Sequence, residues 1–226
     1  MTNELAAAAQ ELRKRLADSN FLALVRAAAP PGVHLRTQRE MDRTLHEALE
    51  QHESGQDIHV FGYGSLMWNP GVVHTAWFKA RVQGWHRSFC LRSVIGRGTP
   101  ETPGMMLALD RGGACNGMLI RIPSDRVQDE LTLLWRREMS WGSYQARWVT
   151  ACADAVPVRA LTFVVDRRHE RYVNGLDLQE VARLIDTGSG RLGTCRAYFD
   201  ATMHKLEELG IEDRGMKQLE TRLRRA

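Results

Sequence analysis

Residues 60–66 read Val60-Phe61-Gly62-Tyr63-Gly64-Ser65-Leu66 and are the most informative part of the sequence for the fold. The apolar run from Ile58 to Phe61 has the length and composition of a short buried strand. Two glycines directly after a strand let the backbone turn sharply and approach a ligand closely. Successive N–H groups in such a turn can bind an anion. A tight turn without a ligand is the alternative.

Two sharper interpretations of this stretch are excluded by its residues. A dinucleotide-binding GxGxxG loop would need glycine at position 67, which is Met67. A GxSxG nucleophile elbow would need glycine at both 63 and 67, where tyrosine and methionine stand. Ser65 is therefore a weak candidate for a nucleophile.

Outward from this stretch, the pattern predicts many strands, one inserted helix and further helices at the end. Arg111-Gly112-Gly113 is typical of a hairpin turn, and Ser124 is a plausible N-cap of the inserted helix. This order favours an α+β fold around a curved sheet or small barrel. The predicted strands are 76–92, 105–109, 115–122, 144–152 and 156–165, and the later helices are 177–187, 194–209 and 215–225.

Residues 1–55 differ from the rest because they are rich in helix-forming residues. We expect one amphipathic helix, bent near Ser19-Asn20 and ended by Pro30-Pro31-Gly32. Thr37 followed by Glu40 is a capping-box pattern that predicts a second helix. We therefore expect a helical N-terminal extension, 1–55, used for packing or oligomerisation, followed by the main domain, 56–226.

The composition is that of an ordinary globular protein, with 43% hydrophobic and 26% charged residues and a net charge of +4. This excludes wholesale disorder, and the mild basic surplus suits a small anionic substrate. The four cysteines lack the spacing of a zinc site, and we expect free, mostly buried thiols. Without an apolar run long enough for a membrane helix or a signal peptide, we expect a cytoplasmic protein.

Glu138, in the stretch Arg136-Arg137-Glu138-Met139, is a candidate acid or base. It falls near the apolar face and the C-terminal end of its predicted helix, where burial and the helix dipole both disfavour a negative charge. The flanking arginines would oppose these effects. The result is either a carboxyl tuned to exchange a proton or a structural Glu–Arg pair.

Two further loops could bind an anion. Residues 96–104 carry Arg97 among turn residues, and this exposed cation could clamp a carboxylate. At residues 193–199 a helix begins, so its N–H groups could meet an anion while Tyr198 offers a hydroxyl. The alternatives are a surface crossover loop and a core tyrosine.

Together these segments resemble the ChaC-like γ-glutamylcyclotransferases, in their glutathione-acting branch. The resemblance covers about residues 57–223. It rests on five motifs in order: VFGYGSLMWNP (60–70), GWHRSFCLR (84–92), GRGTPETPG (96–104), LTLLWRREM (131–139) and LGTCRAYF (192–199). It implies a γ-glutamylcyclotransferase-like α+β fold, with a small mixed β-barrel and surrounding helices.

The resemblance also implies cleavage of glutathione to 5-oxoproline and cysteinylglycine, without a metal or cofactor. By matching position, Tyr63, Gly64, Ser65 and Leu66 would hold the γ-glutamyl group, largely through their backbone. Glu138 would be the catalytic acid/base. Tyr198 matches a binding-pocket tyrosine, and Arg97 is assigned to the glycine-end carboxylate.

Two alternatives remain open at this stage. One is the same reaction on another γ-glutamyl amine or dipeptide. The other is a non-catalytic binding module of the same fold, contacting nucleic acid through the basic tail that includes Arg222 and Arg224. We expect no nucleic-acid partner, because the acid/base position is intact, and no membrane partner, because no apolar run is long enough for a membrane helix.

Overall fold

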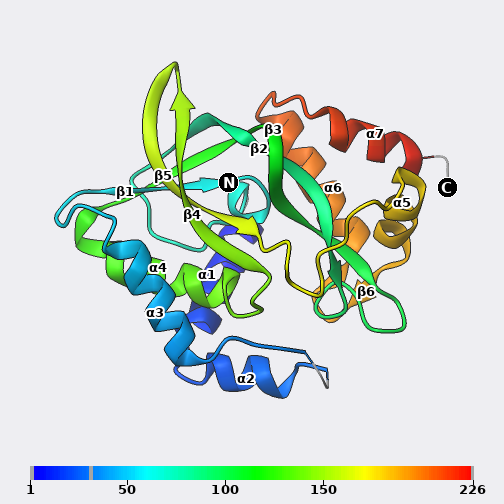
Figure 1. Cartoon of the computed structure of the whole chain (residues 1–226), viewed down its shortest axis with the longest axis horizontal. Helices are drawn as coiled ribbons and strands as arrows, with labels where there is room; N and C mark the ends of the chain where they lie inside the picture. Colours follow the sequence, from blue (N-terminus) through cyan, green and yellow to red (C-terminus); the bar gives the residue numbers. More distant parts are fainter. Residues whose placement is uncertain (1–2, 31–32, 225–226) are drawn as a thin grey trace. The chain divides into compact units, whose positions relative to one another are not determined.

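The computed structural model describes residues 3–30 and 33–224 (Figure 1). Pro31 and Gly32, which belong to the predicted end of the first helix, lie outside the described residues. The chain divides into two compact units. The first comprises Met1–Val82 and Gly117–Val164, and the second comprises Gln83–Asn116 and Val165–Ala226.

The N-terminal segment forms three helices, α1 (Asn3–Ala17), α2 (Phe21–Ala27) and α3 (Gln38–Leu49). The prediction of one bent helix before Pro30 was wrong, because the chain leaves the helix between α1 and α2. The side chain of Asp18 accepts a hydrogen bond from the N–H of Asn20 at 2.8 Å, which offers the backbone a local alternative to the helix. The predicted capping box of Thr37 and Glu40 is present at the start of α3.

Five strands form a closed barrel in the order β1-β3-β2-β4-β5, with a further pairing of β3 with β5. Strand β1 is antiparallel to β3, with Ile58 opposite Ile122, and parallel to β5, with Val60 opposite Leu161. The predicted α+β fold with a small mixed barrel is therefore confirmed. The strands are β1 (Ile58–Gly62), β2 (Ala76–Ser93), β3 (Gly104–Ile122), β4 (Tyr144–Ala153) and β5 (Val156–Val165).

One predicted turn lies inside a strand. Arg111-Gly112-Gly113 does not form a hairpin turn between two strands, because the single strand β3 continues through it from Gly104 to Ile122. Gly112 and Gly113 have φ angles of +103° and +65°, so the glycines absorb a local irregularity of a long strand. The ring of His86, on β2, makes a 3.1 Å hydrogen bond with the carbonyl oxygen of Gly112.

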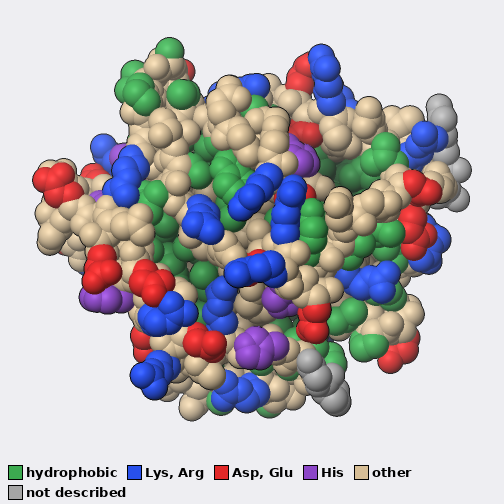
Figure 2. All heavy atoms as spheres, in the orientation of Figure 1, with side chains coloured by type: hydrophobic (Ala, Val, Ile, Leu, Met, Phe, Trp, Pro, Cys, Tyr) green, Lys and Arg blue, Asp and Glu red, His purple; other side chains and the backbone are tan. Residues whose placement is uncertain are grey.

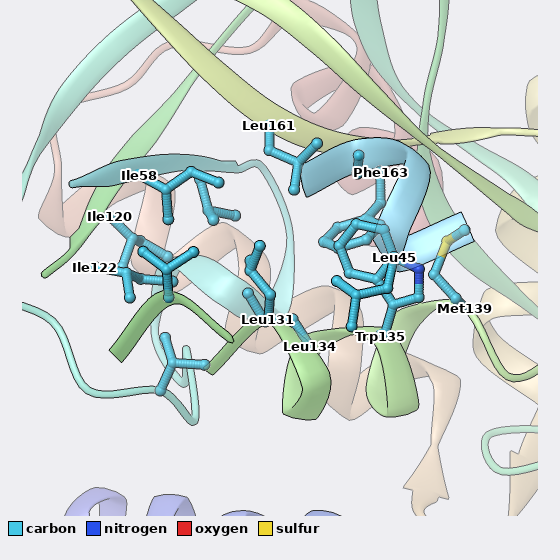
Figure 3. Close-up of a cluster of buried hydrophobic side chains, with 14 of the residues drawn as sticks. Leu45, Ile58, Ile120, Ile122, Leu131, Leu134, Trp135, Met139, Leu161 and Phe163 are labelled. Atoms are coloured by element: carbon cyan, nitrogen blue, oxygen red, sulfur yellow. The ribbon is translucent and has the colours of Figure 1, made fainter. Parts of the chain in front are cut away.

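The core of the first unit lies between the barrel and two helices, α3 and α4 (Val127–Glu138) (Figure 3). Leu45 of α3 and Leu131 and Trp135 of α4 pack against Ile58 and Phe163 of the barrel. Helix α4 starts later than the proposed N-cap at Ser124 predicts. Residues Ser124–Arg126 form a separate 3-10 turn, η2, and Arg126, which makes no side-chain cap, precedes α4. This packing fixes the orientation of α4 and therefore the position of its last residue, Glu138.

The second unit holds three helices, of which the first contacts both of the others, and each is preceded by a residue whose side-chain oxygen caps it. Asp177, Thr194 and Asp213 cap their helices by accepting a backbone N–H. The buried guanidinium of Arg87 also pairs with Asp213. The helices are α5 (Leu178–Thr187), α6 (Cys195–Glu208) and α7 (Arg214–Leu223), with the short strands β6 (Ser189–Gly190) and β7 (Gly193–Thr194) before α6.

All four cysteines are free thiols, and three of them are buried; Cys152 is exposed. In the described part of the chain, no helix combines the length and apolar character needed to cross a membrane. The face shown in Figure 2 carries both basic and acidic side chains, with most of the acidic ones toward its edges.

Candidate active site

The backbone turns directly after β1 with very little space around it. A Cβ atom added to Gly62 would lie 2.8 Å from the Cβ of Leu66, closer than real side chains approach one another. A Cβ on Gly117, on the neighbouring strand β3, would lie 2.4 Å from the carbonyl oxygen of Gly62. Both positions therefore need glycine, and the sharp turn predicted after the strand is present.

This turn leads into a single 3-10 turn, η1 (Ser65–Met67). The N–H groups of Met67 and Asn69 donate to the carbonyl oxygens of Gly64 and Ser65, at 2.8 and 2.9 Å. Among the described residues, none accepts a hydrogen bond from the N–H groups of Gly64, Ser65 or Leu66. Three successive donors at the start of a turn can meet an anionic or carbonyl oxygen of a ligand.

The side chains of the predicted binding loop hold the loop in place. The hydroxyl of Tyr63 is buried and donates to the carbonyl oxygen of Phe163, on β5, at 2.8 Å. The side chain of Leu66 belongs to the core described above. Since both side chains are engaged in the protein interior, the backbone of the loop is the part that can face a ligand.

Arg137, the penultimate residue of α4, connects this loop to the candidate acid/base. Its Nη2 donates to the hydroxyl of Ser65 at 2.6 Å, and its Nη1 donates to the carbonyl oxygens of Asn69 at 2.6 Å and Pro70 at 3.2 Å. Its Nε lies 2.9 Å from Oε1 of Glu138. One planar guanidinium thus fixes the loop and the carboxylate relative to each other.

Glu138 is the last residue of α4, as predicted, and its side chain is 15% exposed. Burial raises the pKa of this carboxyl above its ordinary value, and the positive charge and hydrogen bond of Arg137 oppose that rise. The two sequence interpretations therefore coexist. Glu138 forms a structural pair with Arg137, and it is also a carboxyl whose proton is held more tightly than usual.

The glycine-rich loop at 96–104 packs against backbone. Cβ atoms added to Gly98, Gly104 and Gly190 would each lie within 2.1 to 2.5 Å of a backbone atom of the second unit. For Gly190 the neighbour is the carbonyl oxygen of Gly96, so the loop lies against the segment that precedes α6. These glycines are required by close contact between two stretches of backbone.

Arg97 and Tyr198 contact each other within the second unit. The Arg97 guanidinium lies 5.2 Å from the centre of the Tyr198 ring, and its Nη1 donates to the carbonyl oxygen of Thr194 at 3.0 Å. Arg97 is partly buried, so its prediction as an exposed cation was wrong. Tyr198 is 4% exposed and packs edge-to-face against Phe89, as a core tyrosine would.

Sequence reasoning treated Arg137 as a flanking charge and did not identify its contacts with the loop. Its position directly before Glu138 was visible, but Ser65 and Asn69 lie about seventy residues away in the chain. Asn69 was missed as well. Among residues 3–30 and 33–224, no group of three or more His, Cys, Asp or Glu side chains could hold a metal ion.

Comparison with known proteins places these features in a family. Residues 58–226 match the family described as ChaC-like protein. A relative from Escherichia coli (strain K12), named glutathione-specific gamma-glutamylcyclotransferase, is 43% identical over 163 residues, which cover 72% of this chain and 71% of the relative. A relative of the same name from Schizosaccharomyces pombe is 29% identical over 183 residues, covering 71% of this chain and 88% of the relative.

A solved structure shares the fold. The crystal structure of a selenomethionine-labelled γ-glutamyl cyclotransferase specific to glutathione from yeast superposes with a TM-score of 0.70. It is 19% identical, and the superposition covers 75% of this chain and 96% of the yeast chain. With the family match spanning most of the sequence, this chain belongs to the ChaC-like protein family.

Proposed function

We propose that this protein is a glutathione-specific γ-glutamylcyclotransferase that releases 5-oxoproline and cysteinylglycine. The names of the bacterial and fission-yeast relatives support the substrate and the reaction class. The observation that carries the proposal is the guanidinium of Arg137, which bonds the Ser65 hydroxyl and the Glu138 carboxylate at 2.6 and 2.9 Å.

The proposed reaction is intramolecular. The α-amine of the γ-glutamyl group attacks its own γ-carbonyl carbon, a C–N bond closes the five-membered ring, and the bond to the cysteinyl nitrogen breaks. Because nucleophile and electrophile belong to one molecule, positioning supplies much of the rate enhancement and no protein nucleophile is required. This agrees with the weak candidacy of Ser65, whose hydroxyl accepts a hydrogen bond from Arg137.

Glu138 is the proposed acid/base. As a carboxylate it takes a proton from the α-ammonium, which cannot attack while charged, and it then gives the proton to the departing cysteinyl nitrogen. The ring nitrogen loses its second proton to solvent as the lactam forms, and the released amine takes up a proton from solvent. A carboxyl with a raised pKa is better matched to both steps, because it is a stronger base and still able to return the proton. One residue can thus serve both halves of the reaction, and the enzyme regains its starting protonation state.

The backbone N–H groups of Gly64, Ser65 and Leu66 are the proposed ligands of the γ-glutamyl group, with Tyr63 holding the loop from behind. Each N–H that meets a developing oxyanion would contribute about 3–4 kcal/mol. Arg97 is the proposed partner of the glycine-end carboxylate. Its guanidinium has five N–H donors, and one of its nitrogens, Nη1, donates to the Thr194 carbonyl oxygen. Tyr198 is a proposed binding-pocket residue.

Product analysis tests the proposal. Wild-type protein and the Glu138→Gln variant are incubated with glutathione, without added metal, and both products are followed by mass spectrometry. We expect 5-oxoproline and cysteinylglycine in equal amounts from the wild type and almost none from the variant. Products from both proteins at similar rates would refute the role of Glu138.

A panel of γ-glutamyl amines and dipeptides separates the first alternative, because turnover of another donor without glutathione turnover would keep the mechanism and change the substrate. The second alternative is a binding module for nucleic acid. It predicts a salt-sensitive gel shift, which the proposed enzyme should not show. The cytoplasmic location and the domain boundary near residue 56 stay predictions.

A further inference from the structure

The N-terminal helix α1 lies outside the family match, which begins at residue 58, yet it contacts a segment that begins within the binding loop and continues beyond it. That segment is residues 65–73, here called the η1 loop. Its first part contains Ser65 and Asn69, which Arg137 contacts by hydrogen bonds. Its last part contains Gly71 and Val73. All of these residues belong to the first unit.

The centre of the contact is an ion pair between Arg13 of α1 and Glu130 of α4. The guanidinium meets both carboxylate oxygens, and the contact of Nη2 with Oε1 measures 2.6 Å. The Glu130 side chain is 1% exposed, whereas the Arg13 side chain is 37% exposed. A buried carboxylate depends on its partner, because removing the partner leaves an uncompensated charge in the interior.

The same two side chains hold the end of the η1 loop. Glu130 accepts a hydrogen bond from the N–H of Val73 at 3.1 Å, and Arg13 donates to the carbonyl oxygen of Gly71 at 3.4 Å. Gly71 has a φ angle of +67°, which favours glycine. A Cβ on Gly71 would lie 3.4 Å from Leu12 of α1 and 3.6 Å from Nη1 of Arg137, so the loop is enclosed on both sides.

Helix α4 holds α1 at a second point. Arg136 donates from Nη1 to the carbonyl oxygen of Leu16, in the last turn of α1, at 2.6 Å, and to that of Asp18, the residue after the helix, at 3.2 Å. A cation at this end satisfies carbonyl groups that the helix leaves without partners. Helix α4 therefore carries Glu138 at its own end and fixes α1 through Glu130 and Arg136.

We infer that α1 is an internal brace of the active site. Arg13 and Glu130 are positioning residues that keep the η1 loop in the conformation in which the N–H groups of residues 64–66 can bind the substrate. This inference rests on the proposed function for its catalytic consequence. It gives the N-terminal extension a role in substrate affinity, where the sequence indicated a packing or oligomerisation arm.

The test compares the full-length wild type with Arg13→Gln. If the loop is correctly placed in about one-tenth of the molecules, the KM for glutathione rises about tenfold while kcat changes little, because apparent affinity scales with the competent fraction. Hydrogen exchange in peptides covering residues 65–73 should accelerate, while exchange in α3 stays unchanged. The matched control is Arg43→Gln, which breaks an exposed pair with Glu47 in the same N-terminal segment and should leave both readouts unchanged.

The double variant Arg13→Gln with Glu130→Gln provides a rescue. It removes the uncompensated charge and keeps an oxygen for the Val73 N–H, so its KM should lie closer to wild type than that of Arg13→Gln alone. If Arg13→Gln does not fold, Arg13→Lys keeps the charge without the two-point contact and should show a smaller rise in KM.

Faster loop exchange with a raised KM supports the brace. Faster loop exchange with an unchanged KM would refute the catalytic role of the brace. Exchange that rises equally in α3 would show that α1 stabilises the first unit in general, and would also refute the brace. If the wild type turns over no γ-glutamyl substrate, the proposed function fails separately. Loop exchange that Arg13→Gln leaves unchanged would then also refute the brace.

Discussion

Two glycine-containing loops of this protein look alike in sequence and are used differently. At residues 62–66, glycine lets the backbone turn after β1 and leaves three N–H groups without an acceptor among the described residues. At residues 96–104, glycine lets one backbone segment lie against another. The first loop is held by side chains and keeps its backbone available, whereas the second uses its backbone for packing. Glycine content alone therefore does not distinguish a binding loop from a packing contact.

The charged groups of the two regions differ in the same way. Arg137 holds a carboxylate with a raised pKa, whereas Arg97 donates to the Thr194 carbonyl and lies over the buried ring of Tyr198. We therefore expect substitutions near Glu138 to affect turnover, and substitutions near Tyr198 to affect stability or affinity.

The largest effect is expected for Glu138→Gln. Loss of a general acid/base lowers kcat about 10²–10⁴-fold, and glutathione should bind about as well as before because the shape of the side chain is kept. Steady-state kinetics and binding by calorimetry measure the two quantities. A kcat within a few-fold of the wild type would exclude Glu138 as the acid/base.

Arg137→Gln should have the next largest effect. It removes hydrogen bonds of a charged group, each worth about 1.5–3 kcal/mol, so kcat/KM should fall about 10–100-fold. Loss of the positive charge should also raise the pKa of Glu138 further and move the acid limb of the pH–rate profile to higher pH.

Two further variants, one conservative and one a control, help to interpret the result for Arg137→Gln. Arg137→Lys keeps the charge but not the planar fork, so it should lower kcat/KM without the same shift of the pH profile. Arg126→Gln, at the exposed start of α4, is the control and should match the wild type. A pH profile that stays unchanged in Arg137→Gln would separate Arg137 from the protonation of Glu138.

Tyr63→Phe should act through the position of the loop. Losing the 2.8 Å hydrogen bond to Phe163 leaves a buried carbonyl oxygen with one partner fewer and costs about 1–3 kcal/mol in the free energy of unfolding. Urea unfolding measures this cost, and we expect KM to rise while kcat changes less. Unchanged stability would show that the hydroxyl does not anchor the loop.

Tyr198→Phe should be the mildest change. Its ring is buried against Phe89, so the variant should keep the packing, leave kcat near wild type and raise KM by no more than a few-fold. A large loss of kcat with KM unchanged would instead assign the Tyr198 hydroxyl a role in the transition state.

Much of the fold was predictable because local patterns and tertiary packing agree. The capping box at Thr37, the strand at Ile58 and the positions of the later helices were all readable from neighbouring residues. The continuation of β3 through Gly112-Gly113 could not be read in this way, because two glycines inside a long strand have the same local pattern as a hairpin turn. Whether β3 ends there depends on its neighbouring strands.

For the candidate site, sequence reasoning selected Glu138 and the loop after β1 but could not connect them. The link is made by Arg137 to Ser65, across about seventy residues of chain, and by Arg13 to Glu130, across more than one hundred. Such contacts leave no local pattern, and an arginine beside a glutamate is usually a solvated pair. The burial of Tyr198 likewise depends on packing against Phe89 in another element.

The most direct test of the account is the titration of the Glu138 carboxyl in the folded protein. Infrared difference spectra of the wild type and Glu138→Gln, recorded across a pH series, isolate this single group. We predict a pKa above the ordinary glutamate value of 4.5. Folding stability contributed by this carboxyl should then be present below pH 4.5 and lost as the pH rises through the higher folded pKa. A pKa at or below 4.5 would show that the ion pair with Arg137 outweighs burial, and would contradict the assignment of Glu138 as a carboxyl tuned to take and return a proton.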